Sequence, residues 1–319
     1  MDINADGKID ILTGCYSHDE MGSEMGGLFQ VLYGSEKGFT APQILKGTDG
    51  VRLVLPSGGS GPMRASAPLV PQDGEAEAAM VAMDADPVID RICTRPTAVD
   101  FDNDGDLDIV SGNFSGTFVL FGGEGAGAFA QLGTVLNDTN GQPLRVDMHS
   151  DPVFADWDGD GDLDILSGSV MGGVYLAVNQ GSRAEPQYAP FETLIPSAGE
   201  SAELSSRVMP DDSHLTMPQN DTRIWVDDVN GDGKLDVLVG DTTQLIMPAD
   251  GLDLATAQAK YDELMRRQSE IWMGAEYGAE GPTQEQMEEQ MKRYEELEKE
   301  FEKVVKREST GFVWLYTRR

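Results

Sequence analysis

The sequence predicts an all-β fold, and three observations carry this prediction. The 319 residues include 37 glycines and 16 prolines spread along the chain, which is typical of a protein with many tight turns. Short runs of alternating aliphatic and small residues lie between glycine-rich turns, as expected for β-strands. One aspartate-rich segment recurs four times, and each copy leads directly into such a run. No apolar run approaches the roughly 20 residues that a bilayer-spanning helix needs, so we expect no membrane insertion.

The four aspartate-rich segments begin at Asp2, Asp100, Asp156 and Asp228 and align without gaps. Each reads D-x-[DN]-x-D-G-[DK]-[LI]-D and continues with two aliphatic residues, a variable residue and glycine. The intervals between their starts are 98, 56 and 72 residues, and the shortest interval is ample for a four-stranded antiparallel blade. A repeated unit of this size predicts a β-propeller of about four blades.

Each repeat contains the strands that a blade requires. The first strand precedes the aspartate-rich loop in every repeat but the first, and the second strand follows the loop directly. The predicted strands are 9–14, 27–34 and 39–45 in the first repeat; 96–100, 107–113, 116–123 and 129–136 in the second; 152–156, 163–169, 172–181 and 191–195 in the third; and 223–228, 235–240 and 311–319 in the fourth.

Two insertions divide the propeller, which we assign to residues 1–251 and 311–319. Residues 56–90 are rich in Gly, Ala, Pro and acids and predict a flexible acidic excursion. Residues 252–310 predict a helical hairpin with a turn at 274–282, whose second helix begins at Thr283 with a capping box completed by Gln286. One face of that helix is apolar, through Met287, Met291, Tyr294, Leu297, Phe301 and Val304. The stripe packs the hairpin on itself or on the propeller rim, or it serves self-association.

The spacing within each loop is suited to calcium, which takes six to eight hard oxygen ligands. Side chains at positions 1, 3 and 5 point inward, glycine at position 6 permits a sharp reversal, and aspartate at position 9 completes the cage. Position 7 is lysine in two copies, so we expect it to contribute its backbone carbonyl. We therefore predict about four Ca²⁺ ions, held by Asp2, Asn4, Asp6, Lys8, Asp10, Asp100, Asp102, Asp104, Asp106, Asp108, Asp156, Asp158, Asp160, Asp162, Asp164, Asp228, Asn230, Asp232, Lys234 and Asp236.

The sequence disfavours two other interpretations of the loops. An EF-hand begins with the same spacing but requires a bidentate glutamate at position 12, where this chain has Thr13, Ser111, Ser167 and Val239. A strand rather than an exiting helix follows each loop, so the EF-hand fails in all four copies. An acidic turn that holds no metal would bring three or four mutually repelling carboxylates together without a cation.

These loops resemble the FG-GAP/VCBS repeats of integrin α-subunit propellers and of many secreted bacterial proteins. The turns 34–39 and 123–129 fit the same pattern, and the order of the longer segments looks like exported FG-GAP proteins of planctomycete-type bacteria. The resemblance implies a propeller with calcium between the first two strands of each blade, in families that serve adhesion, carbohydrate recognition or, in some relatives, lyase chemistry. Related propellers commonly close with six to eight blades, so we expect this chain to be an incomplete arc; a closed four-bladed ring is the alternative.

Charge and cysteine content limit the partners. The formal net charge of −33 disfavours nucleic acid and anionic lipid. Cys15 and Cys93 either pair across neighbouring blades or remain free thiols. No signal peptide precedes the first loop, and we suspect a truncated N-terminus. The resemblance nevertheless implies an extracellular, periplasmic or cell-surface location.

The sequence offers no convincing catalytic set. The best candidate is the cluster of Arg145, Asp147 and His149, whose residue types would suit a calcium-assisted polysaccharide lyase; its simpler interpretation is a linker between blades. We expect a non-enzymatic calcium-stabilised module that binds a protein or carbohydrate. The alternatives are a calcium-dependent polysaccharide lyase that uses His149 and Arg145, and a structural envelope or matrix component that associates through the 252–310 hairpin.

Overall fold

The computed structural model describes residues 1–16, 26–56, 89–130, 132–197, 207–273 and 283–319. The chain divides into two compact units, the first of residues 1–197, 220–241 and 313–319 and the second of residues 198–219 and 242–312. The flexible excursion predicted at 56–90 falls almost entirely on residues 57–88, outside the described residues, as does the predicted turn at 274–282. In the described part of the chain, no helix is both long and apolar enough to cross a membrane.

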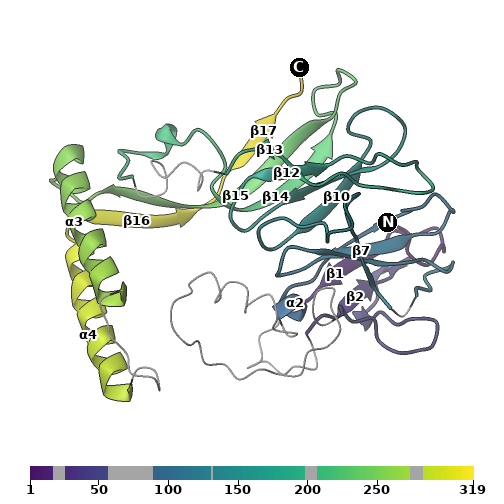
Figure 1. Ribbon diagram of the computed structural model, residues 1–319, viewed down its shortest axis with the longest axis horizontal. Helices are drawn as coiled ribbons and strands as arrows, with labels where there is room; N and C mark the ends of the chain where they lie inside the picture. Colours follow the sequence, from purple (N-terminus) through teal and green to yellow (C-terminus); the bar gives the residue numbers. More distant parts are fainter. Residues whose placement is uncertain (17–25, 57–88, 131, 198–206, 274–282) are drawn as a thin grey trace. The chain divides into compact units, whose positions relative to one another are not determined.

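The first unit is a succession of four β-sheets, which we call blades one to four (Figure 1). Blade one consists of β1 (Ile11–Gly14), β2 (Phe29–Leu32) and β5 (Gln43–Ile44), with a small hairpin of β3 (Gly34–Ser35) and β4 (Gly38–Phe39). Blade two follows the short helix α2 (Ile89–Ile92) and contains β6 (Arg95–Val99), β7 (Asp108–Gly112), β8 (Phe118–Phe121) and β9 (Thr134–Val135).

Blade three contains β10 (Asp151–Ala155), β11 (Asp164–Gly168), β12 (Val174–Ala177) and β13 (Glu192–Ile195). Blade four is built from β14 (Asn220–Asp227), the start of β15 (Asp236–Pro248) and β17 (Val313–Tyr316). Sequence order and sheet order agree in blades two and three, where each strand pairs antiparallel with the next. The predicted all-β propeller with an inserted helical hairpin is confirmed.

Three buried hydrophobic clusters hold successive blades together. One joins blade one to blade two around Phe29 and Phe121, whose rings meet edge to face at 5.4 Å between centroids. A second joins blade two to blade three around Phe118 and Ile165, and a third joins blade three to blade four around Leu166 and Val237. Figure 1 shows β1 and β2 at one end of this series of sheets and β17 at the other. The four blades therefore form an arc in which the two end blades each have one neighbour in a buried cluster.

The backbone of successive blades also meets at one repeated point. The glycine that ends the second strand lies against the carbonyl oxygen of a Ser or Thr in the next blade, so close that a Cβ would come within 1.9 to 2.3 Å of that oxygen. These pairs are Gly14 with Thr94, Gly112 with Ser150, and Gly168 with Thr222. Only glycine allows this approach, because any side chain would collide with the neighbouring backbone.

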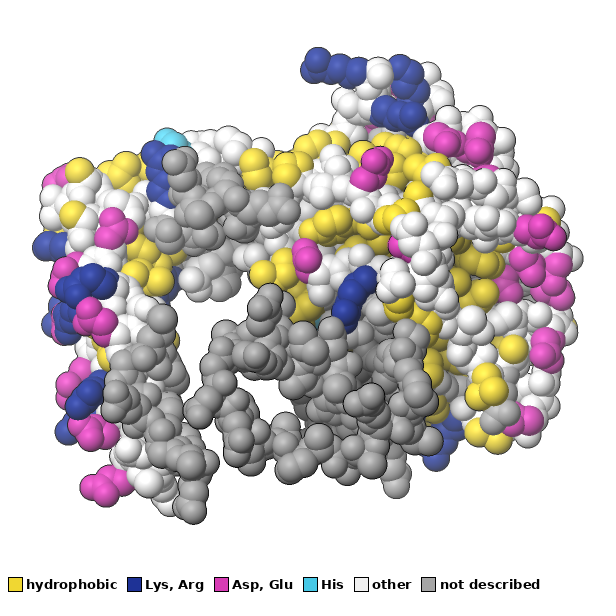
Figure 2. All heavy atoms as spheres, in the orientation of Figure 1, with side chains coloured by type: hydrophobic (Ala, Val, Ile, Leu, Met, Phe, Trp, Pro, Cys, Tyr) yellow, Lys and Arg dark blue, Asp and Glu magenta, His cyan; other side chains and the backbone are white. Residues whose placement is uncertain are grey.

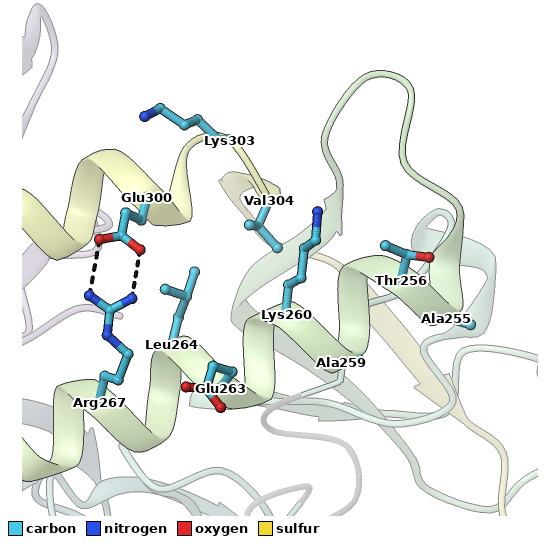
Figure 3. Close-up of a pocket in the computed structure, with 10 residues that line it drawn as sticks. All are labelled: Ala255, Thr256, Ala259, Lys260, Glu263, Leu264, Arg267, Glu300, Lys303 and Val304. Atoms are coloured by element: carbon cyan, nitrogen blue, oxygen red, sulfur yellow. Dashed lines mark hydrogen bonds and ion pairs between the residues drawn. The ribbon is translucent and has the colours of Figure 1, made fainter.

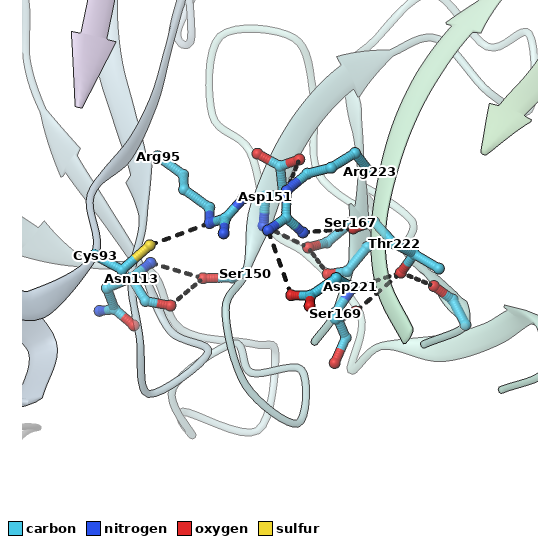
Figure 4. Close-up of polar contacts among 12 residues, drawn as sticks. Cys93, Arg95, Asn113, Ser150, Asp151, Ser167, Ser169, Asp221, Thr222 and Arg223 are labelled. Carbon is cyan, nitrogen blue, oxygen red and sulfur yellow. Dashed lines mark hydrogen bonds and ion pairs between the residues drawn. The ribbon is translucent and has the colours of Figure 1, made fainter. Parts of the chain in front are cut away.

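The hydroxyl of each Ser or Thr completes the contact. It accepts the backbone N–H of the residue after the glycine at 2.6 to 2.9 Å and donates to the carbonyl that precedes the third strand at 2.6 to 3.1 Å. Figure 4 shows two of these contacts, between Ser150 and Asn113 and between Thr222 and Ser169. We call this arrangement the glycine–hydroxyl contact.

The second unit contains two helices and a two-stranded ribbon. α3 (Leu254–Met273) and α4 (Gln284–Phe301) are followed by β16 (Val305–Thr310), which pairs with the second half of β15. The predicted capping box is present at Thr283 and Gln286. Leu297 and Phe301 of the predicted apolar stripe are buried against α3, whereas Met287 and Met291 are about half exposed at 47% and 50%.

The prediction that residues 305–310 belong to the helical hairpin is wrong. α4 ends at Phe301, and Val305–Thr310 forms β16 because its backbone pairs with Thr243–Pro248. Val305 is buried in the cluster of the second unit, and the Arg307 guanidinium lies 4.4 Å from the centre of the Phe301 ring. The partner strand 243–248 is a continuation of β15 beyond the predicted strand 235–240, and this pairing is not visible in local sequence.

The glycine–hydroxyl contact predicts a position-dependent effect of alanine. Gly168→Ala should lower the free energy of unfolding by about 1–3 kcal/mol, because its Cβ would meet the Thr222 carbonyl oxygen at 2.3 Å. Gly240→Ala is the matched control at the equivalent position of blade four, where the nearest neighbour of a Cβ is the Arg223 carbonyl oxygen at 3.8 Å. Urea denaturation should show the first change and a change within about 0.5 kcal/mol for the control. Equal effects of the two substitutions would contradict this account.

Candidate metal site

The four aspartate-rich loops occupy the same place in the fold. In blades two to four each loop connects the first strand to the second, and in blade one it leads into β1. A strand follows every loop directly, whereas an EF-hand loop would be followed by a helix. Figure 2 shows Asp and Glu side chains gathered along one edge of the first unit, where Lys and Arg side chains are few. The loops thus add negative charge at repeated, structurally equivalent points.

Hydrogen bonds from the loop backbone to its own side chains give each loop its curvature. The carboxylate at position 5 accepts the N–H of position 7 in all four copies, at 2.9 to 3.1 Å. The glycine at position 6 has a positive φ of 84° to 98°, a conformation that other residues rarely adopt. In three copies its N–H donates to the carboxylate at position 1, at 2.7 to 3.1 Å.

This curvature brings several carboxylates together. In blade three, oxygens of Asp156, Asp158 and Asp160 all lie within 4.8 Å of one another. In blade two the same is true of Asp100, Asp102 and Asp108, so the aspartate at position 9 joins the group there. Positions 1, 3 and 5 therefore converge in one copy, and positions 1, 3 and 9 in another.

The first and fourth loops carry asparagine at position 3 and lysine at position 7. The side-chain oxygens of Asn4 and Asn230 accept the N–H of position 5 at 3.1 and 2.8 Å, which is the same turn that an aspartate would make. Lys8 and Lys234 are exposed, and their backbone N–H groups donate to the carboxylate at position 5, as the residues at position 7 do in the other two loops. Replacement of aspartate by asparagine or lysine at these positions therefore leaves the backbone path of the loop intact.

The aspartate at position 9 is the most deeply buried member of each loop, with 0% to 4% of its surface exposed. Its Oδ1 accepts the N–H of the residue two positions beyond the third strand, at 2.7 to 3.0 Å in all four blades. In the first three loops its Oδ2 accepts the N–H of position 2 at 2.6 to 2.8 Å. These side chains belong to Asp10, Asp108, Asp164 and Asp236.

This aspartate therefore fastens the loop to the neighbouring strand, a role that the sequence analysis did not predict. Two carboxylate oxygens offer about four lone-pair directions, so N–H acceptance does not prevent ligation of a cation. The sequence could have indicated this role. Among the predicted ligand positions, only position 9 begins the second strand or immediately precedes it.

Within the aspartate-rich loops, three buried carboxylate oxygens lack a hydrogen-bond partner among the described residues. They are Asp100 Oδ1, Asp162 Oδ1 and Asp236 Oδ2, one in each of loops two to four. Burial raises the pKa of Asp162 above its ordinary value, and the nearby carboxylates Asp160, Asp164 and Asp158 raise it further. Burial also raises the pKa values of Asp108 and Asp164. Asp100 also belongs to a group of converging carboxylates, and hard oxygen donors gathered in this way fit a hard divalent cation such as Ca²⁺.

Two arginines that the sequence analysis missed hold loops from the following blade. Arg183 of blade three donates to the backbone carbonyls of Asp100 and Phe101 in the second loop. Arg318 of blade four donates to the carbonyl of Trp157 in the third loop, and its guanidinium lies 4.9 Å from the centre of that ring. Neither arginine belongs to the repeated motif, so only the packing of adjacent blades shows this role.

Of the three catalytic candidates, Arg145 and Asp147 have side-chain hydrogen bonds, whereas the Nδ1 atom of His149 is buried and has no hydrogen-bond partner among the described residues. Arg145 Nε donates to the Ser115 carbonyl at 3.0 Å, and Asp147 accepts the Tyr175 hydroxyl at 2.8 Å. His149 is 8% exposed, packs on the Phe114 ring at 4.5 Å between centroids and has a φ of +53°. These positions suit the linker between blades two and three.

The two cysteines are free thiols in this structure. Cys93 is buried and its sulfur accepts Arg95 Nε at 3.3 Å, while Cys15 accepts the Gln30 side-chain amide at 3.9 Å. The two segments meet through an isolated β-bridge between Tyr16 and Cys93, outside the strands. Of the two alternatives, a disulfide or two free thiols, the structure has two free thiols.

The second unit has a surface groove that contains none of the predicted site residues. Figure 3 shows it between α3 and the end of α4, where Arg267 and Glu300 form a two-pronged ion pair at 2.6 and 3.0 Å. Leu264 and Val304 supply apolar lining, and Lys260, Glu263 and Lys303 supply charges of both signs. The described residues that line the groove carry both positive and negative charges. None of them has a buried polar atom without a hydrogen-bond partner that would specify a ligand.

The fold and the loops together define a class, namely a β-propeller with aspartate-rich loops that lead into the second strand of each blade. Residues 100–167, which contain the second and third loops, match the protein-family model described as an FG-GAP-like repeat. No curated protein matches the chain at a significant level. A propeller built from FG-GAP-like repeats suggests a module for binding or adhesion.

The two kinds of aspartate predict different effects of alanine. Asp164→Ala should destabilise the protein by about 2–4 kcal/mol even in excess chelator, because it removes a buried acceptor of backbone N–H groups. Asp160→Ala, at an exposed position of the same loop, should change the stability in chelator by less than about 1 kcal/mol. Urea denaturation of both variants in chelator measures this. A larger loss for Asp160→Ala than for Asp164→Ala would contradict the structural role of position 9.

The lowered pKa of His149 predicts that the stability of the protein depends on pH. Burial lowers its pKa below 6.5, and the nearby positive charges of Arg95 and Arg223 lower it further. The unfolded state then binds the proton more readily, so stability that is present above pH 6.5 is lost as the pH falls through 6.5 toward the folded-state pKa. His149→Asn should reduce this loss, because asparagine tolerates a positive φ and does not titrate. Urea denaturation of both proteins between pH 7.5 and pH 5.5, roughly one unit either side of the ordinary histidine pKa, tests this. Parallel pH dependences would contradict it.

Proposed function

We propose that this protein is a calcium-stabilised FG-GAP-type propeller that acts as a non-enzymatic binding or adhesion module for a protein or carbohydrate. The observation that carries the proposal is the convergence of carboxylates in the loops together with buried carboxylate oxygens that have no hydrogen-bond partner. Hydrogen bonds within the loop set its shape but leave these oxygens uncompensated. A divalent cation would supply the missing positive charge.

The residues that would hold the ion in blade three are Asp156, Asp158 and Asp160, with Asp162 and Asp164 beside them. In blade two they are Asp100, Asp102 and Asp108. Bound calcium would supply charge compensation and would fix the loop between the first two strands of its blade. The first and fourth loops have asparagine in place of one carboxylate each, so we expect weaker binding there.

The binding role rests on the propeller architecture and on the lack of a convincing catalytic group among the described residues. The buried, strand-linking aspartates hold the loops to a rigid scaffold, and rigid presentation of loops is a common basis of recognition. We place the protein outside the cytoplasm, where millimolar calcium would fill even weak oxygen-only sites.

Calcium should raise the melting temperature, and the rise should depend on pH. A ligand that binds the native state alone stabilises it by about 2.7 kcal/mol per site at 100 times Kd. Folding raises the pKa values of Asp108, Asp162 and Asp164, so protonation of these groups stabilises the metal-free fold. This stabilisation is lost as the pH rises through the folded-state pKa values. Protons therefore compete with calcium, and the calcium-dependent rise should be largest at neutral pH and shrink toward pH 4.

Differential scanning fluorimetry with calcium and with excess chelator, repeated from neutral to acidic pH, measures this difference. Asp160→Ala should reduce the calcium-dependent rise, while Asp211→Ala, an exposed aspartate outside the loops, should keep it. Magnesium serves as the ion control. Identical melting curves in calcium and in chelator at neutral pH would rule out the proposed metal role.

A further inference from the structure

The segment that follows the third strand of a blade is fastened to the aspartate-rich loop of the same blade. In blade three the N–H of Asn179 donates to Asp164 Oδ1 at 2.8 Å, and in blade four the N–H of Arg318 donates to Asp236 Oδ1 at 3.0 Å. Both acceptors are position 9 aspartates that are 0% exposed. The place of each segment therefore depends on the conformation of the loop to which it is tied.

In blade three this segment continues into a turn, residues 179–188, which the side chain of Asn179 closes. Its Oδ1 accepts the N–H groups of Gly181 and Gln187 at 2.9 and 2.8 Å, and its amide donates to the Ser182 carbonyl at 3.3 Å. Through its backbone N–H and its side chain, this one residue joins the turn to the third loop.

The turn of blade three reaches the second loop through two side chains. The guanidinium of Arg183 donates to the backbone carbonyls of Asp100 and Phe101, the second at 3.0 Å. The ring of Tyr188 lies 6.0 Å from the ring of Phe101 between centroids. Asp100 is position 1 of its loop and belongs to the group of converging carboxylates. The second and third loops are therefore connected by a continuous series of contacts.

Blade four makes the same connection with a single residue. The N–H of Arg318 binds position 9 of the fourth loop, and its guanidinium donates to the carbonyl of Trp157 in the third loop and lies 4.9 Å from the centre of that ring. The N–H of Trp157 in turn donates to Asp164 Oδ2 at 2.8 Å. Arg318, like Arg183, thus bonds to backbone carbonyls of the loop, which leaves the loop carboxylates available to a cation.

Blade two provides a comparison within the same chain. Its turn at residues 123–129 also lies against the preceding loop, where a Cβ at Gly127 would come within 3.1 Å of the Ile3 carbonyl oxygen. This turn contains no arginine, so it has no charged donor for the carbonyls of the first loop. The connection through an arginine therefore joins the second, third and fourth loops.

We infer that Arg183 and Arg318 are positioning residues that couple the calcium loops, so that an ion held in one loop favours binding in the loop of the preceding blade. The inference rests on the proposed calcium role. A loop held in one conformation by its ion also fixes its position 9 aspartate and the segment tied to it. The arginine then lies on the carbonyls of the preceding loop, which loses less conformational freedom when it binds its own ion. By linkage the effect is reciprocal.

Direct repulsion between bound cations acts in the opposite direction. Two like charges weaken each other's binding, but salt at about 0.15 M largely screens charges that are more than about 8 Å apart. The sign of the coupling therefore distinguishes the two effects. The connection through an arginine gives positive cooperativity that disappears with the arginine, whereas repulsion gives negative cooperativity that persists without it.

Trp157 supplies a natural probe of the third loop. The experiment is a calcium titration of the full chain at about 0.15 M salt, followed by tryptophan fluorescence, with Trp157→Phe to identify the signal of that residue. Asp232→Ala, at exposed position 5 of the fourth loop, should weaken calcium binding at the third loop by at least about 5-fold. In an Arg318→Met background it should change that affinity by less than about 2-fold, as for independent sites.

Arg318→Met is specific, because methionine keeps the backbone N–H that binds Asp236. Arg183→Met is the matched control: it removes the arginine at the second loop and should leave the effect of Asp232→Ala on the third loop intact. Melting temperatures in chelator show that the variants fold. The total calcium-binding isotherm, measured by competition with a chromophoric chelator, is a second readout and should lose positive cooperativity when both arginines are replaced.

The outcomes separate this inference from the proposed function. A parent protein that binds no calcium in either measurement would overturn the calcium role, and the coupling with it. Calcium binding in the parent with an equal effect of Asp232→Ala in the presence and absence of Arg318 would overturn the coupling alone. Tighter binding at the third loop in Asp232→Ala would do the same, because repulsion between the ions would then dominate.

Discussion

The buried carboxylate at position 9 of each loop is the interaction on which the repeated blade depends. It joins the loop to the N–H beyond the third strand in every blade, and in three blades it also binds the N–H of position 2. Through one side chain, three chain segments that are separated in sequence are fixed relative to one another. An apolar side chain at this position would leave buried N–H groups without an acceptor, and such groups are costly to bury.

The same loops concentrate negative charge beside the aspartate at position 9, whose hydrogen bonds hold the loop to the third strand. Burial raises the pKa of Asp162, and the charges of the neighbouring Asp160 and Asp164 raise it further. Folding therefore brings carboxylates together at a free-energy cost that a bound cation would offset. This links two functions of one motif: position 9 organises the strands, and positions 1, 3 and 5 gather the oxygens that a cation would need.

Interblade packing uses a second repeated device, in which a glycine at the end of the second strand receives a hydroxyl-bearing residue of the next blade. Gly14, Gly112 and Gly168 have such a neighbour. Arg183 and Arg318 add hydrogen bonds from one blade to the loop of the preceding one. Blades three and four thus each support the loop of the preceding blade, so the geometry of loops two and three depends on the blade that follows.

The sequence by itself determined the repeat, the strand order within a blade and the position of the loops, because each follows from short-range patterns: alternation in the strands, glycine at a positive φ, and aspartates two residues apart. It also determined the start of α4, since a capping box is local. Tertiary structure alone decided that Val305–Thr310 is a strand and that Arg183 holds the second loop. These outcomes depend on which distant segment lies alongside, and the local pattern of residues does not encode that neighbour.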